Sequence, residues 1–262
     1  MYNLDFSIII PTYNNLDLFK RAVDSVLMQK NISYEIIVVD DSTNNYIESH
    51  VKKTNQPPVR YYHNQPSKGA VANWNFGLSL AKGKYVEILH HDEALANEYI
   101  LWKVKQQFET THSHAVIANY KVLIEGVIKK EHPIKKHLYT FFIKHPILLF
   151  LSNLLGPCAC VFIENYKIDH FDEKLHWLVD VDWYYRIFKN RKISMLAPNL
   201  VIASIHGHKG QITKSLDIQT EVSKDTQIIV SKYHCFFINI LLKTNKLLNK
   251  SLVKKIIKKT LL

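Results

Sequence analysis

Short apolar runs alternate with segments of helical periodicity over the first 110 residues. Apolar residues recur every three or four positions over residues 16–27 and again over 70–82, which predicts two helices. Asn14 or Asn15 would cap the first helix, and Gly83 would end the second. Four short, mostly apolar segments predict strands, and the continuous run at residues 6–10 is typical of a central strand that is buried on both faces of a sheet. The four segments cover residues 6–10, 35–39, 59–62 and 85–89.

This order of strands and helices defines the expected fold class. Strand, helix and strand at such spacing imply right-handed crossovers, so we expect an α/β protein with a Rossmann-like, mostly parallel central sheet and helices on both faces. The crevice beyond the carboxyl ends of the strands is the usual ligand site of such a sheet. Three segments that follow predicted strands should meet there, namely residues 11–13, 40–41 and 90–92.

The side chains of these three segments have the chemistry of a nucleotide diphosphate site. The ring of Tyr13 beside Pro11 could stack on a base, and Asp41 could accept from ribose or imide donors. Asp92 with its two neighbouring imidazoles could hold a divalent metal that neutralises a diphosphate. The alternatives are that Tyr13 packs against the protein, that Asp41 caps a turn, that the imidazoles belong to the core, and that Asp92 and Glu93 begin a helix.

The second half of the chain carries a further pair of carboxylates. Val179, Trp183 and Ile187 are spaced by four residues, which predicts a helix with Asp180 and Asp182 in its first turn. These acids could simply complement the helix dipole, but that does not explain why so apolar a segment carries them inward.

Three other segments of this half are informative. Residues 156–162 are typical of a loop that enters a strand, and residues 203–213 of a strand that runs into a loop rich in glycine and histidine. That loop could close over a ligand or be an ordinary surface loop. Residues 140–151 are too short to span a bilayer and too apolar for an exposed loop, so they form either core or a membrane-facing helix.

Composition narrows the class of protein. With 262 residues, 47% of them hydrophobic, the chain can form one large domain or two small ones. The absence of an apolar run of about 20 residues and of a signal peptide predicts a cytoplasmic protein. The three cysteines are odd in number and lack C-x-x-C spacing, so we expect reduced thiols.

The net charge of +11 is concentrated towards the C-terminus, where eight lysines follow Asp225. Within residues 252–262, apolar pairs alternate with lysine pairs, which predicts a helix with one oily and one basic face. Such a helix suits an anionic membrane surface, although it could also pack on the domain. Nucleic acid is not the expected partner, because the lysines are interleaved with few aromatics and match no known binding motif.

Five motifs occur in fixed order, namely Ser7-Ile-Ile-Ile-Pro-Thr-Tyr-Asn14, Val38-Val-Asp-Asp-Ser42, Asn73-Trp-Asn-Phe-Gly77, Ala81-Lys-Gly-Lys-Tyr85 and Leu89-His-His-Asp-Glu93. In their order and spacing they resemble the family 2 glycosyltransferases of the GT-A fold. The likeness is strong over residues 5–110 and looser over 150–215, and it implies a nucleotide-sugar-binding half at 1–110 and an acceptor-binding and catalytic half at 111–215. The tail lies outside the likeness, and we expect residues 216–262 to form a basic amphipathic helical extension.

The resemblance assigns donor and metal roles. Asp92 would bind Mn or Mg as the second acid of the family's Asp-x-Asp motif, and His90 stands where the first acid is usual. We interpret His90 as a variation, since an imidazole can bind Mn or a hydroxyl. His206 would complete the metal site, with His208 and Lys209 in reserve. The nucleotide sugar would contact Pro11, Tyr13, Asn14, Asp41, Lys68, Gly69, His90 and His91.

The resemblance also implies a catalytic base and an acceptor region. Asp180 matches the acid of the family's Glu-Asp motif, with Val179 replacing the glutamate and Asp182 as the second candidate. The acceptor would lie against Gly156, Pro157 and Cys158.

The expected function is therefore metal-dependent, inverting glycosyl transfer of the EC 2.4 class. The donor would be a nucleotide-diphosphate sugar, most commonly UDP-linked in this family, and the acceptor a glycan or lipid-linked glycan of a bacterial capsule, O-antigen or lipooligosaccharide. The protein would lie peripherally on the inner face of the membrane. A nucleotidyltransferase would instead show a Gly-rich basic loop after the first strand. A catalytically inactive relative that binds nucleotide sugars would explain why His90 replaces the usual acid. A basic nucleic-acid-binding protein would explain the net charge but not the acids at the strand ends.

Overall fold

The computed structural model describes residues 3–124, 127–132, 136–189, 191–195, 201–208 and 217–247. A seven-stranded sheet forms its centre, in the order β10-β6-β9-β4-β1-β2-β3. β9 is antiparallel to its two neighbours, and the other pairs are parallel, which confirms the predicted mostly parallel sheet. The strands are β1 (Phe6–Thr12), β2 (Tyr34–Asp40), β3 (Val59–His63), β4 (Tyr85–Ile88), β6 (Ala115–Ile117), β9 (Val161–Glu164) and β10 (Ile193–Met195).

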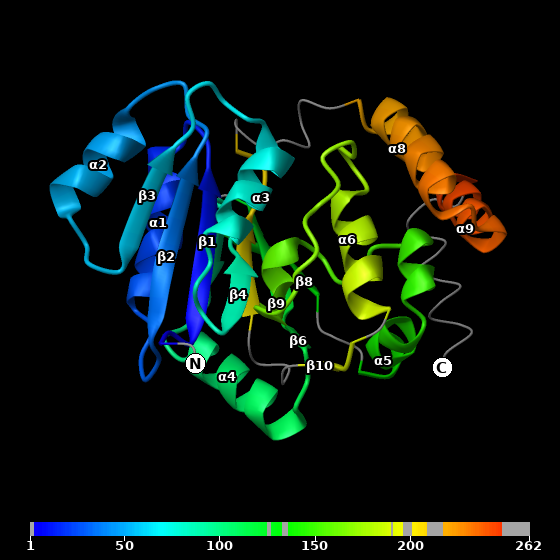
Figure 1. Cartoon of the computed structure of the whole chain (residues 1–262), viewed down its shortest axis with the longest axis horizontal. Coiled ribbons are helices and arrows are strands. Elements are labelled where there is room, and N and C mark those ends of the chain that lie inside the picture. The colour runs from blue at the N-terminus through cyan, green and yellow to red at the C-terminus, as the bar shows by residue number, and fades with distance from the viewer. Residues whose placement is uncertain are drawn as a thin grey trace.

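Alternating side chains of the sheet enter two separate cores. Ile9 and Ile37 pack in the core that also contains residues of α3 and α6, whereas Ile8 and Ile36 pack in the core with residues of α1 and α4. Successive side chains of a strand point to opposite faces, so helices cover both faces as predicted (Figure 1). The helices are α1 (Leu16–Leu27), α2 (Tyr46–Thr54), α3 (Ala70–Ser79), α4 (Ile100–Thr111) and α6 (Val179–Phe188).

A second sheet lies beyond the end of β4. Its order is β5-β11-β7-β8, with bounds β5 (Glu93–Leu95), β7 (Asn119–Ile124), β8 (Val127–His132) and β11 (Val201–Ile205). Because residues 93–95 pair with β11, the alternative of a helix beginning at Asp92 and Glu93 is wrong.

The predicted element boundaries hold closely in the first half. Asn15, and not Asn14, caps α1, since its side chain accepts from the backbone N–H of Leu18 at 3.1 Å. α3 ends at Ser79, earlier than predicted. Gly83 serves a different purpose, because a Cβ there would lie 2.4 Å from the carbonyl carbon of Phe6. Glycine thus lets the chain approach β1 closely.

The apolar segment 140–151 belongs to the core. It forms the end of α5 (Lys136–Lys144) and the 3₁₀ helix η1 (Pro146–Phe150). Phe142, Leu149 and Phe150 are buried against α6 and the C-terminal helices. In the part of the chain that the structure describes, no helix has the length and apolarity to cross a membrane.

Two further helices follow, α8 (Ile218–Tyr233) and α9 (Phe236–Leu247). Figure 1 shows them beside α5 and α6, at the opposite end of the molecule from α2. The predicted amphipathic helix at 252–262 lies outside the described residues.

Candidate active site

The carboxyl ends of β1, β2 and β4 meet, as the sequence predicts. The backbone N–H of Asp41 donates to the carbonyl of Thr12 at 3.0 Å, and that of His91 to the carbonyl of Pro11 at 3.3 Å. Tyr13 is 46% exposed at this edge, so its ring is available to a ligand.

Asp41 organises the loop that leads into α3. Its carboxylate accepts from the hydroxyl of Ser67 at 2.6 Å and from the backbone N–H groups of Lys68 and Gly69 at 2.9 and 2.8 Å. The side-chain amide of Asn64 donates a further bond at 3.0 Å. The structure thus brings Asp41, Lys68 and Gly69 together, and the carboxylate is already engaged by the protein.

Asn14, the residue after Tyr13, links two loops in a comparable way. Its backbone N–H donates to the hydroxyl of Ser42 at 2.8 Å, and its side-chain oxygen accepts from the backbone N–H of Thr43 at 3.0 Å. The loops after β1 and β2 are therefore held in a fixed relation to each other.

Asp92 is paired with His208, with 3.2 Å between Oδ2 and Nε2. Burial raises the pKa of Asp92, but the hydrogen bond of His208 and the nearby imidazoles outweigh it and lower the pKa below its ordinary value. His91 Nε2 and His208 Nδ1 are buried and have no hydrogen-bond partner among the described residues. The backbone N–H of His206 donates to the carbonyl of Leu123. Lys209 lies outside the described residues.

Arg21 of α1 braces this pair, a role that sequence reasoning missed. Its guanidinium donates to the carbonyl of Asp92 at 3.4 Å and to that of Ala203 at 3.0 Å. The backbone N–H of Ile205 also donates to the Asp92 carbonyl, at 2.8 Å. The start of the loop that carries His208 is therefore fixed relative to Asp92.

The donor set suits a divalent cation that is shared with a substrate. One carboxylate and one imidazole are ligands that Mn²⁺ accepts, and such ions often take their other ligands from substrate phosphates. Among the described residues, no group of three or more His, Cys, Asp or Glu side chains is arranged to hold a metal by itself. Asp92 and His208 fit a cation that a diphosphate helps to bind.

His90 is turned towards a second set of residues. Its Nδ1 lies 3.1 Å from Glu93 Oε2, its Nε2 lies 3.5 Å from Cys158 Sγ, and its ring packs edge-on against Trp74 at 4.9 Å. Burial lowers the pKa of His90, yet Cys158 and Glu93 together raise it well above its ordinary value. Both ring nitrogens are thus engaged within the protein.

Asp180 lies in the first turn of α6, close enough to His90 and Glu93 to feel their charges. Its Oδ1 is buried and finds no hydrogen-bond partner within the described part of the chain. Burial raises the pKa of Asp180 to about 6, and the positive charge of His90 opposes the shift. A carboxylate with an unused oxygen and a raised pKa is suited to accept a proton.

Of the three predicted acceptor residues, Cys158 lies near this carboxylate. Cys158 is buried against His90, and burial together with the nearby charge of Asp180 raises the pKa of its thiol. Gly156 has φ +93°, and its carbonyl accepts from the hydroxyl of Tyr184 at 3.1 Å. Gly156 and Pro157 are partly exposed.

Asp182 has a different environment. It is fully buried and accepts from Arg186 Nε at 2.9 Å, Lys232 Nζ at 3.0 Å and the hydroxyl of Tyr233 at 2.5 Å. Its oxygens are taken up by α8 and by its own helix.

An open α/β sheet with an aromatic ring, carboxylates and imidazoles at its carboxyl edge is typical of nucleotide-binding enzymes. Comparison with known families is specific. The model of glycosyl transferase family 2 matches residues 7–169, more than half of the chain. The chain belongs to glycosyl transferase family 2.

Its relatives include bacterial glycosyltransferases. An uncharacterised glycosyltransferase of Rickettsia bellii is 28% identical over 82% of this chain and 31% of its own length. The putative colanic acid biosynthesis glycosyl transferase WcaA of Escherichia coli is 29% identical over 69% of this chain and 65% of its own. The chain thus spans about a third to two thirds of these curated relatives.

Solved structures share the fold. TarS residues 1–349 of S. aureus, in complex with UDP-GlcNAc, superimposes with a TM-score of 0.68 at 20% identity over 87% of this chain and 66% of that one. The same TarS fragment with UDP superimposes with a TM-score of 0.65. This confirms the GT-A fold.

Proposed function

We propose that the chain transfers a sugar, with inversion, from a nucleotide-diphosphate sugar to a hydroxyl of a glycan or lipid-linked glycan. The observation that carries this proposal is the buried oxygen of Asp180 near His90, which has no hydrogen-bond partner among the residues that the structure describes, in a family 2 glycosyltransferase. A fully satisfied carboxylate such as Asp182 lacks the free oxygen that a base needs.

The donor would bind along the carboxyl edge of the sheet, within residues 1–110. The exposed ring of Tyr13 would stack on the base, and the loop at Lys68 and Gly69, held by Asp41, would approach the diphosphate. UDP is the proposed nucleotide, supported by the complexes of the TarS fragment with UDP and UDP-GlcNAc.

The reaction would be a direct displacement at the anomeric carbon. Asp180 would take the proton of the acceptor hydroxyl as its oxygen attacks, and no covalent intermediate is needed. With a pKa of about 6, Asp180 is ionised at neutral pH and is a stronger base than an ordinary aspartate. A divalent cation bound by Asp92 and His208 would offset the negative charge on the departing nucleoside diphosphate.

The acceptor would approach within residues 111–215, along Gly156 and Pro157. Similarity to the putative colanic acid biosynthesis enzyme supports a surface polysaccharide as the product. Contact with the inner face of an anionic membrane is supported by α9, where Phe236 is 72% and Phe237 68% exposed, and by the eight lysines after Asp225.

Release of nucleoside diphosphate from a panel of nucleotide sugars, with and without Mn²⁺, tests this function. We expect release from one donor class, faster with Mn²⁺, and about 10²- to 10⁴-fold slower with Asp180→Asn. Equal release by that variant would contradict the proposed base. Pyrophosphate release from a nucleoside triphosphate and a sugar phosphate would support a nucleotidyltransferase instead.

A further inference from the structure

The chain segment that precedes Asp180 is held by a carboxylate from a distant helix. Asp225 of α8 is fully buried and accepts from three consecutive backbone N–H groups, those of His176, Trp177 and Leu178. The shortest two of these bonds are 2.7 Å. Asp180 follows Leu178 by two residues.

These N–H groups belong to the approach to α6, where helices need outside partners. The first N–H groups of a helix have no acceptor within it, and a Ser, Thr, Asp or Asn at the N-cap usually supplies one. α6 has Leu178 at its N-cap, and no side-chain cap bond forms there. Asp225 instead accepts from the N–H of Leu178 itself and from those of the two residues before it, so α8 fixes the segment that leads into α6.

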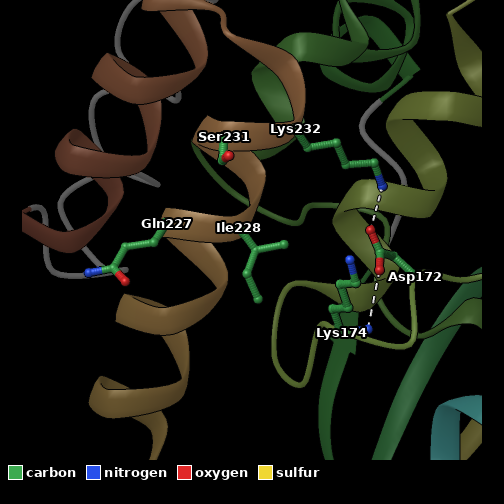
Figure 2. A pocket seen from close by; sticks show the side chains of 6 residues that line it. All are labelled: Asp172, Lys174, Gln227, Ile228, Ser231 and Lys232. Atoms are coloured by element: carbon green, nitrogen blue, oxygen red, sulfur yellow. Dashed lines mark hydrogen bonds and ion pairs between the residues drawn. The ribbon is translucent and has the colours of Figure 1, made fainter.

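A second contact fixes the first turn of α6 to the same helix. Lys232 lies 2.8 Å from Asp172 Oδ2 and 3.0 Å from Asp182 Oδ2, and it joins the loop, α6 and α8. Figure 2 shows Lys232 reaching from α8 to Asp172. Beside this contact is a groove of about 580 Å³, lined by Asp172, Lys174, Gln227, Ile228, Ser231 and Lys232. Polar contacts of Asp225 and Lys232 therefore link α8 to this loop and to α6.

We propose that Asp225 is a positioning residue for glycosyl transfer. It holds the start of α6 so that the Asp180 carboxylate stays beside His90 and faces the acceptor hydroxyl. The inference rests on the proposed function of Asp180 and extends the catalytic apparatus to α8, outside the residues 7–169 that match the family model.

Asp225→Asn tests the proposal, since asparagine keeps the shape but replaces one acceptor oxygen with a donor that faces N–H groups. We expect kcat for nucleoside diphosphate release to fall about 10- to 100-fold, as for other misplaced catalytic groups, with donor KM unchanged. The assay uses the fastest donor of the panel, below the variant's melting temperature. Should this variant not fold, Asp225→Ser, which keeps one acceptor oxygen, takes its place.

Glu221→Gln is the matched control. Glu221, also on α8, contacts His176 Nδ1 at 2.7 Å but none of the three backbone N–H groups. The kcat of Glu221→Gln should equal that of the wild type. A folded Asp225 variant with wild-type kcat, alongside an inactive Asp180→Asn, would overturn the positioning role and leave the proposed function standing. An active Asp180→Asn would instead overturn the proposed function.

Discussion

Asp180 and Asp182 lie in the same turn of α6 yet have opposite surroundings. Asp182 accepts from three side chains, whereas Asp180 has a buried oxygen with no partner in the described structure. The difference follows from helix geometry, because residues two apart point to different sides. One side faces α8 and the other faces His90.

The raised pKa of Asp180 predicts the acid limb of the pH profile. The base must be ionised, so kcat/KM should fall below about pH 6, tenfold for each further pH unit. The ionisable groups that shift the pKa of Asp180 are His90, which lowers it, and Glu93, which raises it. Initial rates measured at a series of acidic pH values give this fall in kcat/KM. A limb near the ordinary aspartate value of about 4 would contradict burial as its cause.

Glu87 of β4 predicts a pH dependence of stability. It is fully buried, neither carboxyl oxygen has a partner within the described chain, and burial raises its pKa well above the ordinary value. The folded state then holds the proton more tightly than the unfolded chain, so this group's contribution to stability falls as pH rises above about 4.3. Glu87→Gln should be more stable than wild type at neutral pH in urea unfolding, and equal to it in acid.

Glu35→Gln is the control of opposite sign. Burial acts to raise the pKa of Glu35, but hydrogen bonds from Ser7 and Arg60 outweigh it and lower the pKa. That carboxylate therefore contributes stability above its unfolded pKa, and the contribution is lost in acid. Its glutamine variant should lose stability at neutral pH. A destabilised Glu87→Gln at neutral pH would show that Glu87 is ionised in the fold.

Single residues were predictable where motifs determine them. Asp41, Asp92 and Asp180 follow from strand ends and the family likeness, and the structure brings each to the sheet edge or beside it. The sequence could not select His208 over His206 as the partner of Asp92, because the spacing of the two histidines does not determine the path of the loop that carries them. Asp225 was missed because a carboxylate that accepts from backbone N–H groups almost 50 residues away in the sequence leaves no local sequence pattern.

At the scale of elements, α3 connects the loop at Lys68 and Gly69 to the sheet. Gly77 lets it approach β1, since a Cβ there would lie 2.3 Å from Ile9 Cγ2 and 3.3 Å from Val39 Cγ2. The loop at Lys68 and Gly69 leads directly into this helix. The close packing therefore fixes where that loop meets Asp41.

Gly77→Ala should push α3 away from the sheet. The overpacking should cost about 1 to 3 kcal/mol of unfolding free energy and raise the donor KM, because the loop at Gly69 moves with the helix. Urea unfolding and donor titration measure the two effects. Ser79→Ala, at an exposed position of the same helix, should change neither. A stable Gly77→Ala with unchanged KM would show that α3 can shift without cost.

Elements were more predictable than residues because periodicity reports burial directly. β1 and β2 are buried on both faces of the sheet, which explains why their apolar runs are continuous. Glu93–Leu95 was open to two readings because three residues carry no period, and pairing with β11 decides the outcome. Likewise, the core position of residues 140–151 depends on α6 and α9, which lie far along the chain.

At the scale of the whole molecule, two surfaces come from different parts of the chain. One is the carboxyl edge of the central sheet, where we propose that the donor binds, and the other is the exposed face of α9. Phe236, Phe237 and Ile240 form this exposed face, and Ile238 and Leu242 are buried in the core. Lys243 is exposed on the same helix. An apolar face beside basic residues suits an anionic bilayer.

The double variant Phe236→Ser/Phe237→Ser should weaken binding to phosphatidylglycerol vesicles. Burying a phenylalanine contributes about 1.5 to 3 kcal/mol, so sedimentation with vesicles should fall at least tenfold. Tyr46→Ser/Tyr166→Ser, which removes exposed aromatics elsewhere, is the control and should bind as wild type. Equal binding by the phenylalanine variant would contradict a role of α9 at the membrane.

The most direct test of the central claim compares Asp180→Asn with Asp182→Asn in the same transfer assay. Asp180→Asn should keep the fold and donor affinity while losing about 10²- to 10⁴-fold in kcat, as expected for removal of a general base. Asp182→Asn should instead lower the melting temperature, because Arg186 and Lys232 lose a buried partner, and keep most of its kcat below that temperature. Loss of transfer in Asp182→Asn with near wild-type transfer in Asp180→Asn would contradict the account.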